Sequence, residues 1–128
     1  MAKKKISYEL YSYGIYSRWE RESKQLPKLV EITTQITIKP DIEFGYVIKI
    51  KGAKGKKLVY EIDHPLFKDK HGNIEAPFVG EVYVNSNDYE FFLGDTVWEP
   101  YEDKAGEWKL STWMDDELIA YKQLILRL

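Results

Sequence analysis

The chain of 128 residues contains no cysteine. This absence excludes disulfides, thiolate metal ligands and thiol nucleophiles together. Long apolar runs are also missing, because no stretch approaches the ~20 residues that span a bilayer. Residues 1–10 begin with lysines, but no apolar segment follows them as a secretory signal would require. We therefore expect a cytoplasmic protein that does not associate with membranes.

A charge excess of one sign is lacking as well. The chain has 19 basic and 21 acidic residues, for a net charge of −2. The whole molecule therefore gives no strong nucleic-acid signal.

A sustained apolar period of 3.6 residues is absent, whereas two-residue alternation recurs along the chain. Aromatic residues reach 15%, and tyrosine and tryptophan favour strands. The alternation predicts strands at residues 6–17, 29–38, 42–51, 57–63, 80–85 and 89–93, followed by a hairpin over 106–128. The second to fourth of these strands are predicted to form an antiparallel meander with one wet face.

The terminal hairpin pairs residues 106–113 with 118–128 around an acidic turn. Trp108 and Leu110 share an apolar face with Leu124 and Leu126, and Trp113 points the other way. A bulge near residues 121–122 would repair the phase of the last strand. Because residues 115–117 include no glycine, we expect a loop longer than a tight two-residue turn.

Several short strands separated by turns predict an all-β fold in which two antiparallel sheets pack as a sandwich of about seven to eight strands. The length favours a single domain over residues 1–128. The long segments 63–79 and 94–105 are predicted loops, and loops of this length often bind ligands.

Four motifs carry a family resemblance. They are Ser-Tyr-Gly-Ile-Tyr at residues 12–16, Asp-His-Pro-Leu at 63–66, Gly-Asp-Thr-Val-Trp-Glu-Pro at 94–100 and Gly-Glu-Trp-Lys-Leu-Ser-Thr-Trp at 106–113. In this order they resemble an uncharacterised bacterial family of small immunoglobulin-like β-sandwich domains of unknown function. The resemblance covers residues 7–126. It implies an immunoglobulin-like sandwich and assigns no activity.

One candidate metal or acid–base site lies in the first long loop. Its ligands would be Asp63, His64, Asp69 and His71, with Glu75 nearby. Their spacing matches no defined metal loop. The alternative is structural, since Asp69 to Asn73 is a natural turn.

A second candidate is a run of lysines in the predicted hairpin between the strands at 42–51 and 57–63. A polyanion could bind there through Lys49, Lys51, Lys54, Lys56 and Lys57. The alternative is that these lysines keep the turn soluble and guard a sheet edge.

A third candidate consists of aromatic residues in loops or off the apolar phase, namely Trp19, Trp98, Tyr101 and Trp113. Exposed aromatic side chains anchor protein partners or sugars. The alternative is that they cap the ends of the sandwich.

The sequence shows no nucleophile elbow and no phosphate-binding loop. We therefore expect no cofactor and a non-catalytic module, monomeric or weakly dimeric. It would bind a protein partner through aromatic loops or a sheet edge. The alternatives are a metal- or ligand-dependent enzyme using residues 63–75, and polyanion binding through residues 49–57.

Overall fold

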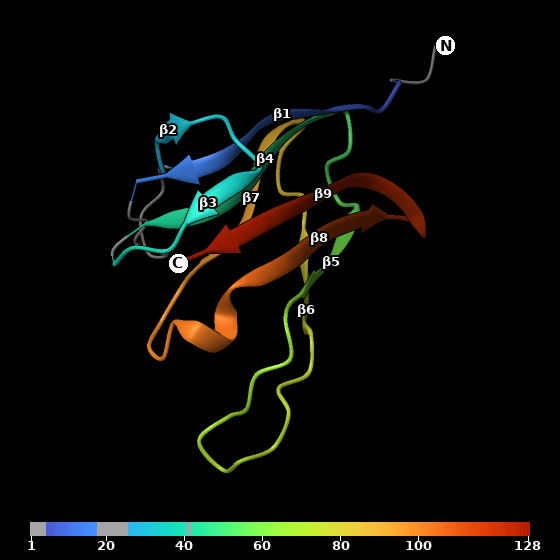
Figure 1. Cartoon of the computed structure of the whole chain (residues 1–128). Coiled ribbons are helices and arrows are strands. Elements are labelled where there is room, and N and C mark those ends of the chain that lie inside the picture. The colour runs from blue at the N-terminus through green and yellow to red at the C-terminus, as the bar shows by residue number, and fades with distance from the viewer. Residues whose placement is uncertain (1–4, 18–25, 41) are drawn as a thin grey trace.

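The computed structural model describes residues 5–17, 26–40 and 42–128. Within these residues the chain forms nine strands and one short 3-10 helix (Figure 1). They are β1 (Ser7–Tyr16), β2 (Leu29–Glu31), β3 (Gln35–Thr37), β4 (Glu43–Lys51), β5 (Lys57–Asp63), β6 (Phe78–Tyr83), β7 (Asp88–Thr96), η1 (Glu102–Lys104), β8 (Gly106–Met114) and β9 (Glu117–Arg127). No helix in the described part of the chain is long and apolar enough to cross a bilayer.

The strands form two sheets that pack face to face. A four-stranded sheet has the order β2-β1-β4-β7, and a five-stranded sheet has the order β3-β9-β8-β5-β6. This arrangement confirms the predicted all-β sandwich, with nine strands rather than seven to eight. The strands are mostly antiparallel, as predicted, but β3 runs parallel to β9.

The core fills the space between the sheets, where the predicted alternation places apolar side chains inward. From β4 come Phe44, Tyr46, Ile48 and Ile50; from β5, Leu58 and Ile62; from β8, Trp108 and Leu110; and from β9, Leu124 and Leu126. Each of these side chains is buried. Burial of this apolar area between the layers is the main stabilising term of the fold.

The predicted meander of residues 29–38, 42–51 and 57–63 is wrong. β4 pairs with β1 and β7, whereas β5 pairs with β6 and β8 in the other sheet. The predicted wet face of β4 is also largely buried, because β4 lies in the middle of its sheet. On that outer face Val47 packs with Tyr16 and Phe92, and Leu26 covers the cluster.

The predicted strand at residues 29–38 is two short strands in different sheets. β2 belongs to the four-stranded sheet and β3 to the five-stranded sheet. Thr33 turns the chain between them, since its Oγ1 accepts a hydrogen bond from the Gln35 backbone N–H at 3.0 Å. At Gly14 of β1 the backbone approaches the Glu31 carbonyl so closely that a Cβ would clash. This agrees with the close approach expected for a glycine inside a strand.

The terminal hairpin is confirmed, but two of its predicted details are wrong. The turn is a tight two-residue turn, in which Asp115 and Asp116 take φ angles of 49° and 64°. Aspartate tolerates this left-handed conformation better than most residues. The extra residue of β9 is Ile119 rather than a residue near 121–122, because Thr112 faces Ala120 while Trp113 faces Leu118.

Two other strands differ from prediction in their bounds. β6 starts at Phe78, two residues before the predicted strand, because Phe78 pairs with Ile62. β7 continues to Thr96, where β4 still provides a pairing partner in Glu43. Together these changes shorten both predicted loops.

Candidate functional site

A groove of about 580 Å³ runs between β6 and β7, which are the edge strands of the two sheets. Its lining is mostly apolar and comes from both sheets. It includes Tyr60, Ile62, Phe78, Val79, Val82, Phe91, Phe92 and Leu93, with the charged groups Glu81 and Asp95 and the backbone of Gly94. A concave apolar site with a few polar groups is the usual form of a binding site.

Tyr60 and Phe91 bridge the two sheets inside this groove. Their ring centroids are 5.9 Å apart, with Tyr60 on β5 and Phe91 on β7. The Tyr60 phenol also lies against Gly80 of β6, where any Cβ would meet its hydroxyl oxygen. A glycine at this position therefore allows Tyr60 to reach the groove.

The two strands that flank the groove each have a neighbour on one side only among the described residues. β6 pairs with β5, and β7 pairs with β4. On β6 the side chains of Val79 and Tyr83 are 66% and 62% exposed. The β6 segment carries neither proline nor lysine, which are residues that commonly block edge pairing.

The opposite side of the sandwich is built differently. Its edge strands β2 and β3 have only three residues each. The chain between them crosses from one sheet to the other, and the Thr34 carbonyl accepts a hydrogen bond from the Ile125 N–H of β9 at 2.7 Å. Short edges and a crossing chain offer little backbone to an incoming strand.

The loops that carry the predicted partner-binding residues Trp98 and Tyr101 lie over one end of the core. Trp98 is 41% exposed, and its ring packs against Phe67 at 5.5 Å and Phe78 at 6.2 Å. Tyr101 packs on the core cluster. Trp113 lies near the other end of β8, so the structure does not bring it together with Trp98. Trp19 lies outside the described residues.

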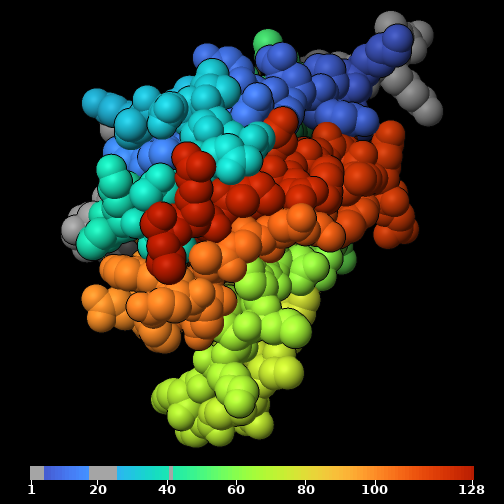
Figure 2. All heavy atoms as spheres, in the orientation of Figure 1, coloured from blue at the N-terminus to red at the C-terminus, as the bar shows by residue number. Residues whose placement is uncertain are grey.

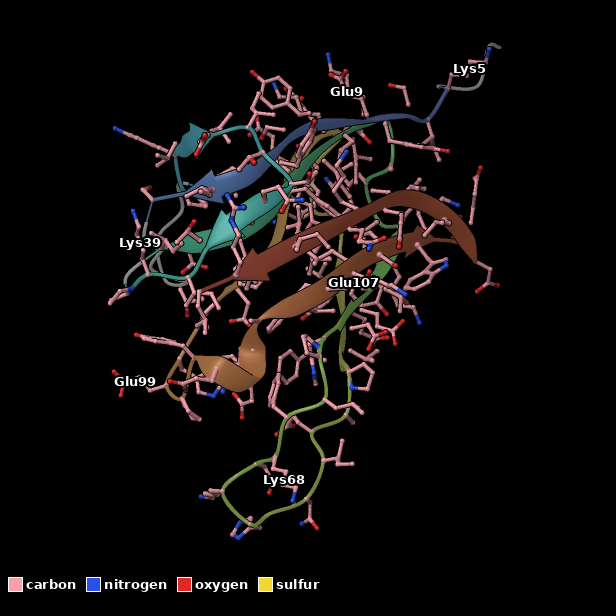
Figure 3. All side chains as sticks on the ribbon, in the orientation of Figure 1. Lys5, Glu9, Lys39, Lys68, Glu99 and Glu107 are labelled. Carbon is pink, nitrogen blue, oxygen red and sulfur yellow. The ribbon has the colours of Figure 1, made fainter. Side chains whose placement is uncertain are left out.

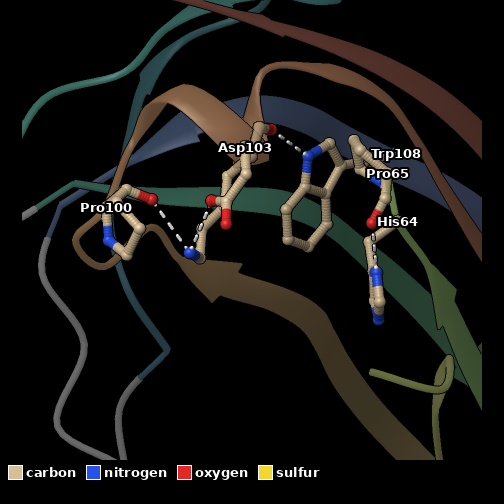
Figure 4. A network of polar contacts seen from close by, with 6 residues as sticks. His64, Pro65, Pro100, Asp103 and Trp108 are labelled. Atoms are coloured by element: carbon tan, nitrogen blue, oxygen red, sulfur yellow. Dashed lines mark hydrogen bonds and ion pairs between the residues drawn. The ribbon is translucent and has the colours of Figure 1, made fainter. Parts of the chain in front are cut away.

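The buried side chain of Lys104 holds these loops together through hydrogen bonds and ring contacts. Its side chain is only 1% exposed, and Nζ donates to the Pro100 carbonyl at 2.9 Å and to Asp103 Oδ1 at 3.0 Å (Figure 4). The same ammonium lies 4.8 Å from the ring centres of both Phe67 and Trp98. Cation–π contact and charge-assisted hydrogen bonds thus compensate a buried charge.

The candidate metal ligands have other roles in the structure. His64 is buried, and its Nδ1 and Nε2 lie 2.8 Å from the Pro65 carbonyl and 2.9 Å from the Ala76 carbonyl. Asp63 accepts from the His64 N–H, and Asp69 accepts from the His71 N–H. No group of three or more metal-ligating side chains occurs among the described residues.

The segment that carries Asp69 and His71 projects away from the two sheets (Figure 2). Figure 3 shows Lys68 on this projection, held by a bridge between Lys68 and Ile74. Asp69 shapes its tip by accepting hydrogen bonds from two backbone N–H groups. The tip therefore has the form of the natural turn that the sequence offered as an alternative.

The candidate lysines do not flank a hairpin, because β4 and β5 belong to different sheets. Lys49 lies over the ring of Tyr11 at 3.6 Å. Lys56 pairs with Asp115 at 2.7 Å, and Lys57 pairs with Glu81 at 3.4 Å. Lys51 and Lys54 are exposed. Neighbouring carboxylates thus offset part of the positive charge.

Among the described residues, the groups with resolved pKa shifts are tyrosines. Burial raises the pKa of Tyr46 well above its usual value, although its hydrogen bond with Thr112 acts in the opposite direction. Burial also raises the pKa of Tyr16 and of Tyr89. All three are therefore neutral side chains near pH 7.

Comparison with known proteins places the chain in a family. The model described as "Domain of unknown function (DUF3859)" matches residues 4–124. The chain belongs to this family. The resemblance inferred from the four motifs is thereby confirmed, and the DUF3859 family itself carries no assigned activity.

A solved structure supports the immunoglobulin-like fold of this DUF3859 chain. An immunoglobulin-like protein from Pseudomonas aeruginosa superimposes with a TM-score of 0.76 at 20% identity, covering 99% of this chain and 100% of that one. An alkylpurine DNA glycosylase from Pseudomonas fluorescens, bound to DNA with an abasic site analog, gives 0.43 at 11% identity, covering 99% and 32%. The second likeness is too weak to carry an argument. No curated protein matches the chain.

The groove residues were not among the predicted site residues. The sequence predicts a loop at Val79 and a strand at Tyr83, with no site at either residue. The segment 78–83 is rich in aromatic and β-branched residues, namely Phe78, Val79, Val82 and Tyr83, which is a recognisable strand signal. Nothing in that local pattern indicates that the strand lies at an edge.

Proposed function

We propose that this domain is a non-catalytic binding module that takes up an extended polypeptide strand on the open side of the sandwich. The observation that carries the proposal is the groove between β6 and β7, where each flanking strand has a sheet neighbour on one side only among the described residues and both strands border one apolar surface. An edge strand presents backbone N–H and C=O groups that another strand can pair with.

The lining of the groove supports an extended strand with apolar side chains as the occupant. Backbone pairing along β6 would fix an incoming strand, and its alternate side chains would point toward Phe78, Val82 and Phe91. Such a strand would carry apolar residues at every second position. Val79 and Tyr83 are exposed on a strand that carries neither proline nor lysine.

The test uses a displayed library of random linear peptides and a matched pair of variants. Val79 of β6 is 66% exposed and Val30 of β2 is 65% exposed. We expect selected peptides to show two-residue alternation and to slow amide hydrogen exchange over residues 78–83. Val79→Lys should weaken binding about tenfold or more, about 1.4 kcal/mol, by placing a charge on the edge.

Val30→Lys is the control, because it introduces the same charge at equal exposure on the short opposite edge. It should leave binding unchanged. If the library yields no binder, or if selected peptides bind Val79→Lys as tightly as the parent chain, strand addition at β6 is refuted.

A further inference from the structure

A second cavity, of about 470 Å³, lies beside the β8–β9 turn. Its lining residues come from β5, β8 and the turn, and they are Lys57, Val59, Trp113, Asp115 and Asp116. In Figure 1 this turn lies at the end of β8 opposite the 3-10 helix. The cavity therefore uses neither the loops around Lys104 nor the backbone edge of β7.

Trp113 and Val59 form the apolar part of this cavity. The two residues are neighbours across β8 and β5, on the face of the sheet that points away from the core. Trp113 is half-buried, so part of its indole ring is accessible. Among the described residues its ring N–H has no hydrogen-bond partner, whereas the buried Trp108 ring donates to the Lys104 carbonyl at 2.9 Å.

The polar groups around the indole nearly balance in charge. Lys57 and Asp116 carry opposite charges, Lys57 also pairs with Glu81 at 3.4 Å, and Asp115 is paired with Lys56 at 2.7 Å. Within the described chain the Asp116 carboxylate has no hydrogen bond or ion pair. Lys57 would repel a strongly cationic ligand, and the two aspartates would repel a strongly anionic ligand.

A neutral ligand with one apolar face and several hydroxyl groups fits these properties. The accessible indole offers a flat surface for a ring face made of C–H groups. Lys57 and the indole N–H donate hydrogen bonds, and Asp116 accepts them, while a hydroxyl group does both. We propose that the cavity binds a neutral sugar ring, with Trp113 stacked on the ring and Asp116 bonded to its hydroxyls.

The size of the cavity agrees with this ligand class. Small-molecule sites in proteins have volumes of about 300–1,000 Å³, and this cavity has about 470 Å³. The site can therefore hold one or two sugar rings at the surface of the sheet. It is independent of strand addition at β6, because Val79→Lys alters none of its lining residues.

The test is calorimetric titration with soluble hexasaccharides of glucose in β-1,4 and α-1,4 linkage, xylose, mannose and N-acetylglucosamine. We expect at least one to bind. Trp113→Ala should weaken that binding about tenfold or more, and Asp116→Asn about threefold, since the amide still accepts a hydrogen bond. Circular dichroism and thermal unfolding establish that each variant is folded.

The control is Tyr11→Ala, which removes an aromatic side chain that is 58% exposed on the other sheet. It should leave sugar binding unchanged. Choline and spermidine, titrated in parallel, should not bind. The proposal is overturned if none of the sugars binds, if Trp113→Ala binds as the parent chain does, or if the cations bind in place of the sugars.

Discussion

The two ends of β8 carry similar residue types in opposite states. At its start Trp108 and Lys104 are buried, and the indole N–H and the ammonium both donate hydrogen bonds within the chain, while the ring nitrogens of the nearby His64 lie within hydrogen-bond distance of backbone carbonyls. At its end Trp113 is half-buried and Asp116 is exposed, and the side chain of neither has a hydrogen-bond partner in the described part of the chain. The same side-chain chemistry thus serves packing at one end and remains available to a ligand at the other.

This difference gives a criterion for distinguishing structural from functional residues in a domain without known activity. A buried polar group whose partners are all supplied by the chain contributes to stability, because losing one partner leaves another group unsatisfied. An accessible polar group beside a cavity contributes little to stability. Substitutions should therefore affect stability at the start of β8 and binding at its end.

The largest effect is expected at Lys104. Lys104→Ala removes the ammonium that bonds Pro100 and Asp103, and it leaves space between Phe67 and Trp98. We expect a loss of about 2–4 kcal/mol in the free energy of unfolding, measured in urea. Lys104→Met should lose less, because it keeps the apolar stem. Surface substitutions usually change the free energy of unfolding by less than about 0.5 kcal/mol. A loss of that size in Lys104→Ala would show that the start of β8 is no more important for stability than its end.

His64→Phe should have the next largest effect. Phenylalanine keeps a ring stacked on Phe67 but cannot bond the carbonyls of Pro65 and Ala76. We expect a loss of about 1–3 kcal/mol and faster proteolysis within residues 64–77. Unchanged cleavage in this segment would show that the histidine does not hold the loop.

A substitution of Tyr46 tests whether a buried hydrogen-bonded pair near the end of β8 stabilises the fold as the buried groups at its start do. Its hydroxyl shares a hydrogen bond of 2.6 Å with Thr112. Tyr46→Phe should cost about 1–2 kcal/mol, because Thr112 loses its partner. The double variant Tyr46→Phe/Thr112→Val should recover part of this loss. Equal stability of the single and double variants would contradict this account.

The same residue predicts a pH dependence. The pKa of Tyr46 is raised by burial above the unfolded value of 10.0. Its contribution to stability is therefore full below pH 10.0, and it is lost as the pH rises further because the unfolded state ionises first. Urea unfolding between neutral and strongly alkaline pH should show a shallower decline in Tyr46→Phe. If the free energy of unfolding declines with pH equally in the parent chain and in Tyr46→Phe, Tyr46 does not cause this pH dependence.

The smallest effect is expected at the turn. Asp115→Asn with Asp116→Gly replaces two residues at positive φ by the preferred pair for this turn type. We expect a gain of about 0.5–1 kcal/mol in thermal unfolding, since the exposed ion pair with Lys56 is worth little. Sugar binding should weaken in the same variant. A destabilised hairpin would show that the aspartates are structural and would remove the contrast with Lys104.

The strands could be predicted from the sequence because alternation is a local property. Residues 57–63 of β5 and the β8–β9 hairpin follow directly from their two-residue period. The division of residues 29–38 into two strands could not be predicted, because the alternation continues through Thr33 without a break in phase. The buried outer face of β4 was missed for a related reason, since Val47 is covered by Tyr16 and Phe92 from distant segments.

The candidate sites were predicted only in part. Trp113 was singled out because it falls off the apolar phase of its strand, and it does lie on the outer face. Trp98 was singled out as a loop residue, but Phe67 and Lys104 cover part of it. The β6–β7 groove had no local signal, because it exists only where the edges of two sheets meet.

The sequence by itself determined that this chain forms strands, which face of most strands is apolar, and where the last hairpin turns. A period of two places side chains on opposite faces whatever the neighbouring strand is. Only the tertiary structure decided which strands share a sheet, which edges stay unpaired and which polar groups find partners. Those outcomes depend on packing between residues far apart in the chain, and local alternation carries no information about such contacts.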